Sequence, residues 1–167
     1  MKVLGIDPGT AACGYGIVHG RGGRLRAGPF GCWRTAASAR PAERLLAIFD
    51  GVRELIAAHA PDAVALEESY VGADARTALS VGQARGAVLV AAAGAGVACA
   101  EYAPARVKQA VCGYGRAEKG QVQRMVRLIL GLDAEPGSSH EADALAVAIC
   151  HALSSPLLAS PPVEVGR

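Results

Sequence analysis

The alternation of apolar and polar positions predicts strands in the first fifth of the chain. Residues 3–7, 13–20 and 24–33 are short apolar-rich segments, and the last two are separated by the turn GRGG. Apolar segments that follow one another through short Gly-rich turns are typical of antiparallel strands. We therefore expect the chain to begin with a three-stranded antiparallel meander.

The pattern then changes to helical spacing. Apolar side chains within residues 43–56 recur every three or four positions, which predicts a helix that ends before Pro61. Residues 61–68, PDAVALEE, and residues 96–102, GVACAEY, predict two further strands. Between them, residues 75–93 are rich in Ala, Leu and Val, and this composition predicts a long buried helix.

The last third of the chain predicts three more helices. A short helix follows Pro104, the loop GYG ends it, and a second helix runs through QVQRMVRLILG. The final helix lies within residues 137–150, GSSHEADALAVAIC. An antiparallel triplet followed by alternating strands and helices predicts an α/β fold, with a five-stranded mixed sheet and helices on both faces. We expect a single domain over residues 1–153 and a flexible tail over residues 154–167.

Composition narrows the class of protein. The chain has 167 residues, of which 51% are hydrophobic and 19% are charged, and these values are typical of a globular domain. Its five cysteines never form a CxxC pair, so neither a disulfide framework nor a zinc site is expected. The first residues, MKVLGID, lack the features of a signal peptide, and the most apolar run is shorter than a membrane span. We expect a cytoplasmic protein that does not associate with a membrane.

Acidic side chains stand where two predicted strands end. Asp7 follows VLGI and precedes PGT, and Glu67 ends AVALE. Because strand side chains alternate, Glu67 shares a face with the small residues Ala63 and Ala65. Glu68 points to the opposite face. A simpler interpretation stays open for both positions, since Asp7 before Pro-Gly suits a turn and Glu67 suits a solvated strand end.

The segment GSSHEADALAVAIC combines helix-starting residues with candidate site residues. Ser138 and Glu141 fit the capping box S-x-x-E, which gives Glu141 a structural role at the helix start. His140 and Asp143 are three residues apart, so they share one face of the helix. A single histidine is more often structural than functional. A histidine and an aspartate beside two other convergent acids favour a site.

A cluster of carboxylates predicts a bound cation, because the charges repel one another and are costly to bury. Oxygen ligands with one imidazole suit Mg²⁺ or Mn²⁺ better than Zn²⁺. Two such ions about 4 Å apart can activate a water and stabilise the leaving oxygen of a phosphodiester. The candidate ligands are Asp7, Glu67, His140 and Asp143.

A local excess of positive charge lies between Pro104 and Arg127, where Glu118 is the only acid. Lys and Arg side chains contact phosphates without reading base sequence, although a solvated helix face has the same composition. Tyr70, just beyond Glu67, suits stacking on an unpaired base or a place at the rim of a site. The basic residues of this segment are Arg106, Lys108, Arg116, Lys119, Arg124 and Arg127.

Five motifs follow one another along the chain: GIDPGTAACGYGIV, ALEESY, ALSVGQARGA, EYAPARVKQAVCGYGRAEKGQVQRMV and EADALAVAIC. Together they resemble the RuvC family of bacterial Holliday-junction resolvases, over about residues 1–153. GIDPGT alone also resembles the opening of actin-like ATPases, but that fold needs two such lobes and a longer chain. GQARG and VKQAVCGYGRAEK in this order make the resemblance specific.

The resemblance implies an RNase H-like fold and a homodimer that binds four-way DNA junctions. It further implies symmetric nicking of two opposed strands in recombination and repair, 5′-phosphate ends, and cooperation with the RuvA and RuvB branch-migration proteins. Two Mg²⁺ or Mn²⁺ ions per active site are expected. Carried over by position, the catalytic and metal-binding residues are Asp7, Glu67, His140 and Asp143. The expected DNA contacts are Tyr70, Arg76, Lys108, Arg116 and Lys119.

His140 departs from the pattern of many members, which have Asp at this position. Imidazole is a softer ligand than carboxylate and titrates nearer neutrality, so His140 is expected to favour Mn²⁺ or to accept a proton. Two other functions stay open, namely cleavage of another substrate such as RNA–DNA hybrids, and junction binding without catalysis. Residues 78–94 are the candidate dimer surface because small residues allow close helix packing, and a buried core helix suits them equally.

Overall fold

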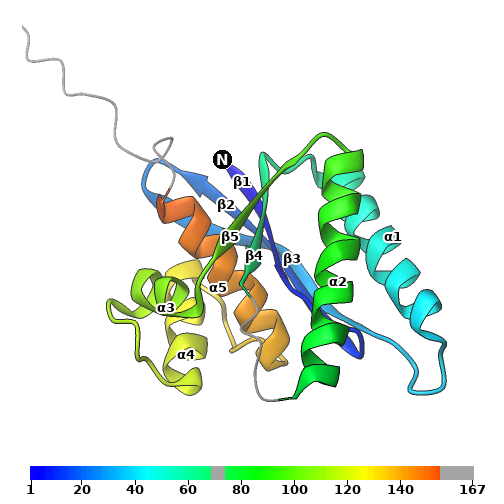
Figure 1. Ribbon diagram of the computed structural model, residues 1–167. Helices are drawn as coiled ribbons and strands as arrows, with labels where there is room; N and C mark the ends of the chain where they lie inside the picture. Colours follow the sequence, from blue (N-terminus) through cyan, green and yellow to red (C-terminus); the bar gives the residue numbers. More distant parts are fainter. Residues whose placement is uncertain (69–73, 155–167) are drawn as a thin grey trace, which may run out of the picture.

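The computed structural model describes residues 1–68 and 74–154. A five-stranded sheet with the order β3-β2-β1-β4-β5 forms its centre (Figure 1). The first three strands pair antiparallel, whereas β4 is parallel to β1 and β5 is parallel to β4. The strands are β1 (Lys2–Asp7), β2 (Ala12–Arg21), β3 (Arg24–Arg34), β4 (Ala63–Glu67) and β5 (Ala98–Tyr102). The structure thus confirms the predicted mixed sheet.

Helices cover both faces of the sheet, as expected (Figure 1). Two buried clusters of apolar side chains follow this division, one on each face. Alternate residues of β1 contribute to different clusters, with Val3 on one face and Leu4 and Ile6 on the other. One face carries α1 (Pro41–His59) and α2 (Ala75–Gly94); the other carries α3 (Pro104–Cys112), α4 (Lys119–Leu130) and α5 (Ser139–Ser154).

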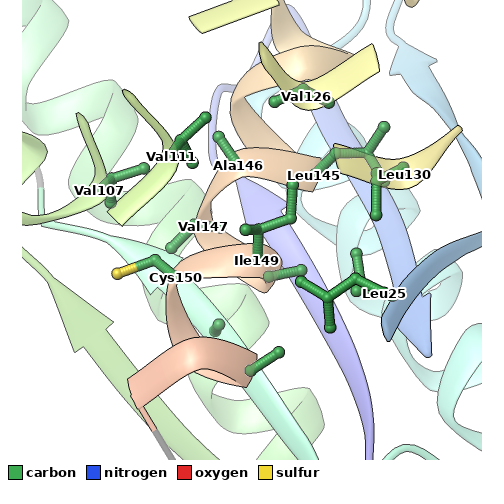
Figure 2. Close-up of a cluster of buried hydrophobic side chains, with 14 of the residues drawn as sticks. Leu25, Val107, Val111, Val126, Leu130, Leu145, Ala146, Val147, Ile149 and Cys150 are labelled. Atoms are coloured by element: carbon green, nitrogen blue, oxygen red, sulfur yellow. The ribbon is translucent and has the colours of Figure 1, made fainter. Parts of the chain in front are cut away.

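Helix α5 is the centre of the second face. Its residues from Ala144 to Ala148 are buried between the sheet and the helices α3 and α4 (Figure 2). Glycines on the neighbouring strands allow this close approach: a Cβ on Gly5 would lie 2.0 Å from the carbonyl oxygen of Ala144. A Cβ on Gly14 would lie equally close, 2.0 Å from the carbonyl oxygen of His140. These contacts bring the first turn of α5 against the end of β1, because Gly14 pairs with Asp7.

The long helix predicted over residues 75–93 is present, but the prediction that it is buried holds for only one of its sides. Within α2, Ala84, Val88, Ala91 and Ala92 are buried, but Leu79 and Val90 are 65% and 63% exposed. Only one stripe of α2 faces the sheet and α1. The abundance of Ala hid this amphipathic character, since Ala occurs on both faces of the helix. Within the described ranges, neither α2 nor any other helix has the length and apolarity needed to cross a membrane.

Candidate active site

Asp7 and Glu67 end two adjacent parallel strands. Ile6 of β1 is paired with Leu66 of β4, so the next residues along both strands lie side by side at the same edge of the sheet. Side-chain alternation places both carboxylates on the face covered by α5, the face to which Val3 and Ala65 contribute their side chains. The structure therefore brings together two acids that are 60 positions apart in the sequence.

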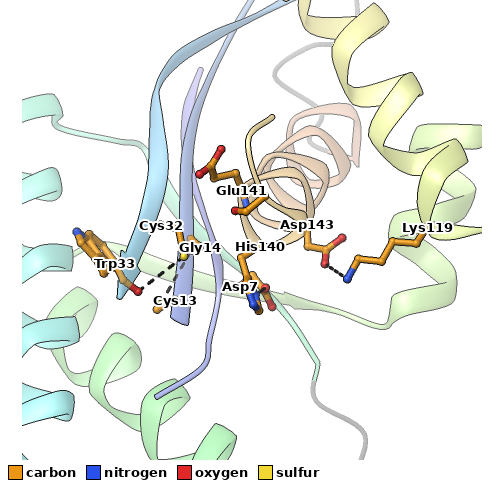
Figure 3. Close-up of polar contacts among 10 residues, drawn as sticks. Asp7, Cys13, Gly14, Cys32, Trp33, Lys119, His140, Glu141 and Asp143 are labelled. Atoms are coloured by element: carbon orange, nitrogen blue, oxygen red, sulfur yellow. Dashed lines mark hydrogen bonds and ion pairs between the residues drawn. The ribbon is translucent and has the colours of Figure 1, made fainter. Parts of the chain in front are cut away.

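The first turn of α5 has the start signal that the sequence predicts. The backbone N–H of Glu141 donates to Ser138 Oγ at 3.3 Å, and the carboxylate of Glu141 accepts from the backbone N–H of Gly137 at 2.8 Å. The second bond differs from a capping box, in which the N–H of Ser138 would be the donor. Glu141 is thus occupied at the helix start and points away from Asp7 (Figure 3).

His140 and Asp143 both reach the edge of the sheet where Asp7 lies (Figure 3). His140 Nδ1 forms a hydrogen bond with Asp7 Oδ2 at 2.6 Å. Asp143 Oδ2 forms an ion pair with Lys119 Nζ at 3.1 Å, and Lys119 is the first residue of α4. Strand β1 and the helices α4 and α5, which are separated in the sequence, therefore contribute charged groups to one site.

Burial and nearby negative charge raise the pKa of two acids of this site, Glu67 and Asp7. Burial, reinforced by the negative charges of Asp143 and Asp7, raises the pKa of Glu67 to about 7, against the opposing effect of Lys108 and Lys119. Burial also raises the pKa of Asp7, and the charge of Asp143 adds to this effect, whereas the hydrogen bond from His140 opposes it. The two lysines nearby do not fully neutralise this negative charge.

A cavity of about 220 Å³ opens beside these acids. Its polar walls are Glu67, Asp143, Lys108 and Lys119, and its apolar walls come from α3, α4 and α5. The cavity thus offers carboxylates that attract cations and, beside them, two ammonium groups that attract phosphate oxygens. This combination of charges suits a site that binds a divalent cation together with a phosphodiester.

The donor set fits divalent cations such as Mg²⁺ or Mn²⁺, because it consists of carboxylate oxygens and one imidazole. Among residues 1–68 and 74–154, however, no three side chains of His, Cys, Asp or Glu stand close enough together to hold one ion in their present positions. Asp7 is bonded to His140, and Asp143 is turned toward Lys119. A bound cation would compete with His140 for an oxygen of Asp7 and with Lys119 for an oxygen of Asp143.

The expected DNA contacts lie in different places. Lys108 and Lys119 line the cavity beside the acids, and Arg116 is exposed in the loop between α3 and α4. Arg76 lies in the first turn of α2, away from that cavity. Tyr70 lies outside the described residues.

Arg76 lines a second cavity, of about 330 Å³, and its neighbours there were not predicted. Arg44 from α1 and the hydroxyls of Thr10 and Ser80, which are hydrogen-bonded to each other, share its walls. Thr10 is three residues beyond Asp7, so the cavity adjoins the active-site edge of the sheet. No sequence signal marks Arg44, because only the packing of α1 against α2 brings it beside Arg76.

Known proteins are similar to this chain in both sequence and fold. The family model described as crossover junction endodeoxyribonuclease RuvC matches residues 3–151. The chain belongs to the RuvC family. RuvC of Moorella thermoacetica is 53% identical over 93% of this chain and 93% of its own length. RuvC of Heliobacterium modesticaldum is 54% identical over 92% of this chain and 95% of its own length.

Solved structures agree with this membership. The Thermus thermophilus RuvC structure has a TM-score of 0.84, and T. thermophilus RuvC in complex with Holliday junction substrate has 0.87. In both, the identity is 44% over 91% of this chain and 93% of the matched chain. The yeast mitochondrial Holliday junction resolvase Ydc2, at 13% identity and a TM-score of 0.64 over 90% of this chain and 77% of its own, shares the fold alone.

RuvC membership confirms the RNase H-like α/β fold and the nuclease class expected from the motifs. The chain is a crossover junction endodeoxyribonuclease, an enzyme of DNA recombination and repair. Nucleases of the RuvC family depend on metal ions.

Proposed function

We propose that this chain resolves four-way DNA junctions as a homodimer, by symmetric hydrolysis of two opposed phosphodiesters that leaves 5′-phosphate ends. The observation that carries this proposal is the convergence of Asp7, Glu67 and Asp143 with His140 and two lysines at one edge of the sheet. Further support comes from T. thermophilus RuvC, a 44% identical protein whose structure was solved with Holliday junction substrate.

Asp7, Glu67, Asp143 and His140 are the proposed ligands of two Mg²⁺ or Mn²⁺ ions. Such ions supply an activated water and screen the negative charge that develops on the phosphate. The raised pKa values of Asp7 and Glu67 support this role, because carboxylates that repel one another gain most from a bound cation. Of the two nitrogens of His140, Nδ1 contacts Asp7, so Nε2 is the atom we assign to an ion or to a proton in transfer.

The lysines have a complementary role. Lys119 lies 3.1 Å from Asp143 and is 59% exposed, so its ammonium group is able to leave the carboxylate and contact a phosphate oxygen. Lys108 lines the same cavity and adds a second positive charge. We assign these two residues to positioning the scissile phosphate and to stabilising its charge in the transition state. Arg116, Arg76 and Tyr70 are proposed to contact the DNA farther from the scissile bond.

A cleavage assay tests this function. The purified chain with Mg²⁺ or Mn²⁺ is expected to cut a synthetic four-way junction by paired symmetric nicks, and to leave linear duplex and RNA–DNA hybrid intact. Preferential cleavage of the hybrid would instead assign another nuclease substrate. Binding of the junction without any cleavage would assign a binding module.

Glu67→Gln and Glu68→Gln form a matched pair for the same assay. Glu67 faces the cavity, whereas its neighbour Glu68 is exposed and does not line it. Loss of a partner that only supports a metal ligand costs about 10–100-fold in affinity or activity, so loss of the ligand Glu67 is expected to cost more than about 100-fold in cleavage rate. Glu68→Gln is expected to cut at the parent rate. Equal rates for the two variants would contradict the assignment.

Cooperation with RuvA and RuvB and a cytoplasmic location complete the proposal. Both rest on the membership of the chain in the RuvC family. Pull-down of the intact chain by RuvA and RuvB bound to a junction tests the first, with the junction alone as the reference.

A further inference from the structure

A groove of about 600 Å³ lies at the end of the molecule opposite the active site. The turn between β2 and β3 forms one wall, the last turn of α4 forms another, and Leu153 near the end of α5 forms the third. Asp7 ends β1 at the active site, whereas Arg21 and Arg24 flank the turn at the other end of the strands. The proposed chemistry therefore makes no use of this groove.

The walls of the groove are apolar and basic. Leu128 and Leu153 are 65% and 52% exposed, which makes them two of the most exposed large apolar side chains of the described residues. Arg24 and Arg26 are exposed beside them, and none of the described residues that line the groove is acidic. An occupant that matches this surface carries branched apolar side chains and a negative charge.

We propose that residues 155–167 of the same chain occupy this groove. The segment, SPLLASPPVEVGR, contains the apolar residues Leu157, Leu158, Val163 and Val165, and Glu164 is its only acid. It therefore offers apolar side chains that match the exposed leucines of the groove, and a carboxylate that complements Arg24 and Arg26. The proposal replaces the free tail expected from the sequence with a docked one.

The attachment point favours this occupant over a separate chain. Leu153 is itself a wall of the groove, so the segment starts within a few residues of its proposed site. A segment tethered at the site binds at a high effective concentration, and even a small apolar contact is then sufficient to hold it.

Hydrogen exchange of the full chain and of a chain ending at Ser154 tests the proposal. The last turn of α4, Leu128 to Leu130, and the turn at Gly22 and Gly23 are covered by the segment in the proposed arrangement. We expect their amides to exchange about tenfold faster or more in the shortened chain, because an uncovered helix end opens more often. The amides of α1 serve as the internal reference and are expected to be unchanged. Equal exchange in both chains would overturn the proposal.

Two substitutions separate docking from a general effect of truncation. Leu128→Ser in the groove is expected to speed exchange within residues 155–167, whereas Leu46→Ser on α1, which is 57% exposed in the parent chain, is expected to leave it unchanged. Docking within one chain also predicts protection that does not depend on protein concentration. Protection that falls on dilution would overturn the proposal in favour of docking between two copies.

Discussion

Among the described residues, His140 is the one imidazole in the candidate metal-ligand set, whose other members are the carboxylates of Asp7, Glu67 and Asp143. Its Nδ1 lies 2.6 Å from Asp7 Oδ2, so this side chain both orients Asp7 and leaves Nε2 for another partner. A neutral imidazole also carries one negative charge fewer than a carboxylate. His140 therefore changes the charge of the site and the softness of its ligands together.

His140→Asp is expected to shift the metal preference of cleavage toward Mg²⁺. Oxygen ligands suit Mg²⁺ better than imidazole does, so the ratio of the Mn²⁺ rate to the Mg²⁺ rate is expected to fall roughly tenfold, which corresponds to about 1.4 kcal/mol. Rates of junction cleavage measured over a concentration series of each ion give this ratio. An unchanged ratio in the variant would remove the proposed role in ion selection.

His151 is a second histidine, distant from the acids, and it makes the folding stability depend on pH. Burial lowers the pKa of His151, whose Nδ1 lies 2.9 Å from the hydroxyl of Tyr102. The unfolded chain therefore binds a proton on this residue more readily than the folded chain does. The contribution of His151 to the free energy of unfolding is fully present well above the unfolded pKa of about 6.5, and it decreases as the pH falls through that value.

His151→Asn is expected to reduce the loss of unfolding free energy between pH 7.5 and pH 5.5. Urea unfolding at the two pH values, followed by circular dichroism, measures this difference. Tyr102→Phe serves as the control, because it preserves the burial of His151 and is expected to keep most of the pH dependence. A difference between the two pH values that is the same in His151→Asn and in the parent chain would contradict the prediction.

At the scale of the elements, the position of α5 against β1 and β2 determines whether the site exists. The glycines at positions 5 and 14 leave room for the backbone of α5, and Gly14 contacts the carbonyl group of His140. The bond from His140 to Asp7 therefore depends on a strand residue that carries no side chain. Because α5 packs so closely against these strands, any displacement of the helix also moves His140 relative to Asp7.

Gly14→Ala is expected to destabilise the fold by about 1–3 kcal/mol or more, because the new methyl group meets backbone atoms that cannot rotate away. Cleavage is expected to fall as well, since His140 is displaced from Asp7. Gly94→Ala at the end of α2 is the matched control, because a Cβ there meets nothing within 4 Å. Urea unfolding and junction cleavage of both variants test the prediction, which fails if Gly14→Ala is as stable and active as Gly94→Ala.

At the scale of the whole molecule, we propose that the exposed stripe of α2 forms the interface of a homodimer. Leu79 and Val90 are eleven residues apart, about three helical turns, and therefore lie on the same side of the helix. Between them, Gly82 and Gly86 have open space around them, which lets a second helix approach. This stripe faces away from α5, so two copies joined through it would keep both active sites accessible.

Val90→Glu is expected to weaken this dimer by about 100-fold or more, because two like charges would meet across a symmetric interface. The control is Leu46→Glu on α1, where the parent side chain is 57% exposed and lies off the stripe. Sedimentation velocity over a range of concentrations measures the dissociation constant. Dimers of equal strength in both variants would place the interface elsewhere.

The sequence by itself determined the order and type of the elements, because strand alternation and helical spacing depend only on neighbouring residues. It also determined that Glu67 and Glu68 point to opposite faces, and that Ser138 and Glu141 start α5. The motifs containing Asp7 and Asp143, together with GQARG and VKQAVCGYGRAEK in this order, were sufficient to indicate a nuclease, since each motif is short and local.

Only the tertiary structure decided what these residues contact. The hydrogen bond between His140 and Asp7, the ion pair of Asp143 with Lys119 and the exposed face of α2 all join parts of the chain that no local pattern connects. The pKa of Glu67 near 7 likewise depends on burial and on charges from other elements. Electrostatic and packing energies depend on distance in space, and the fold alone sets those distances.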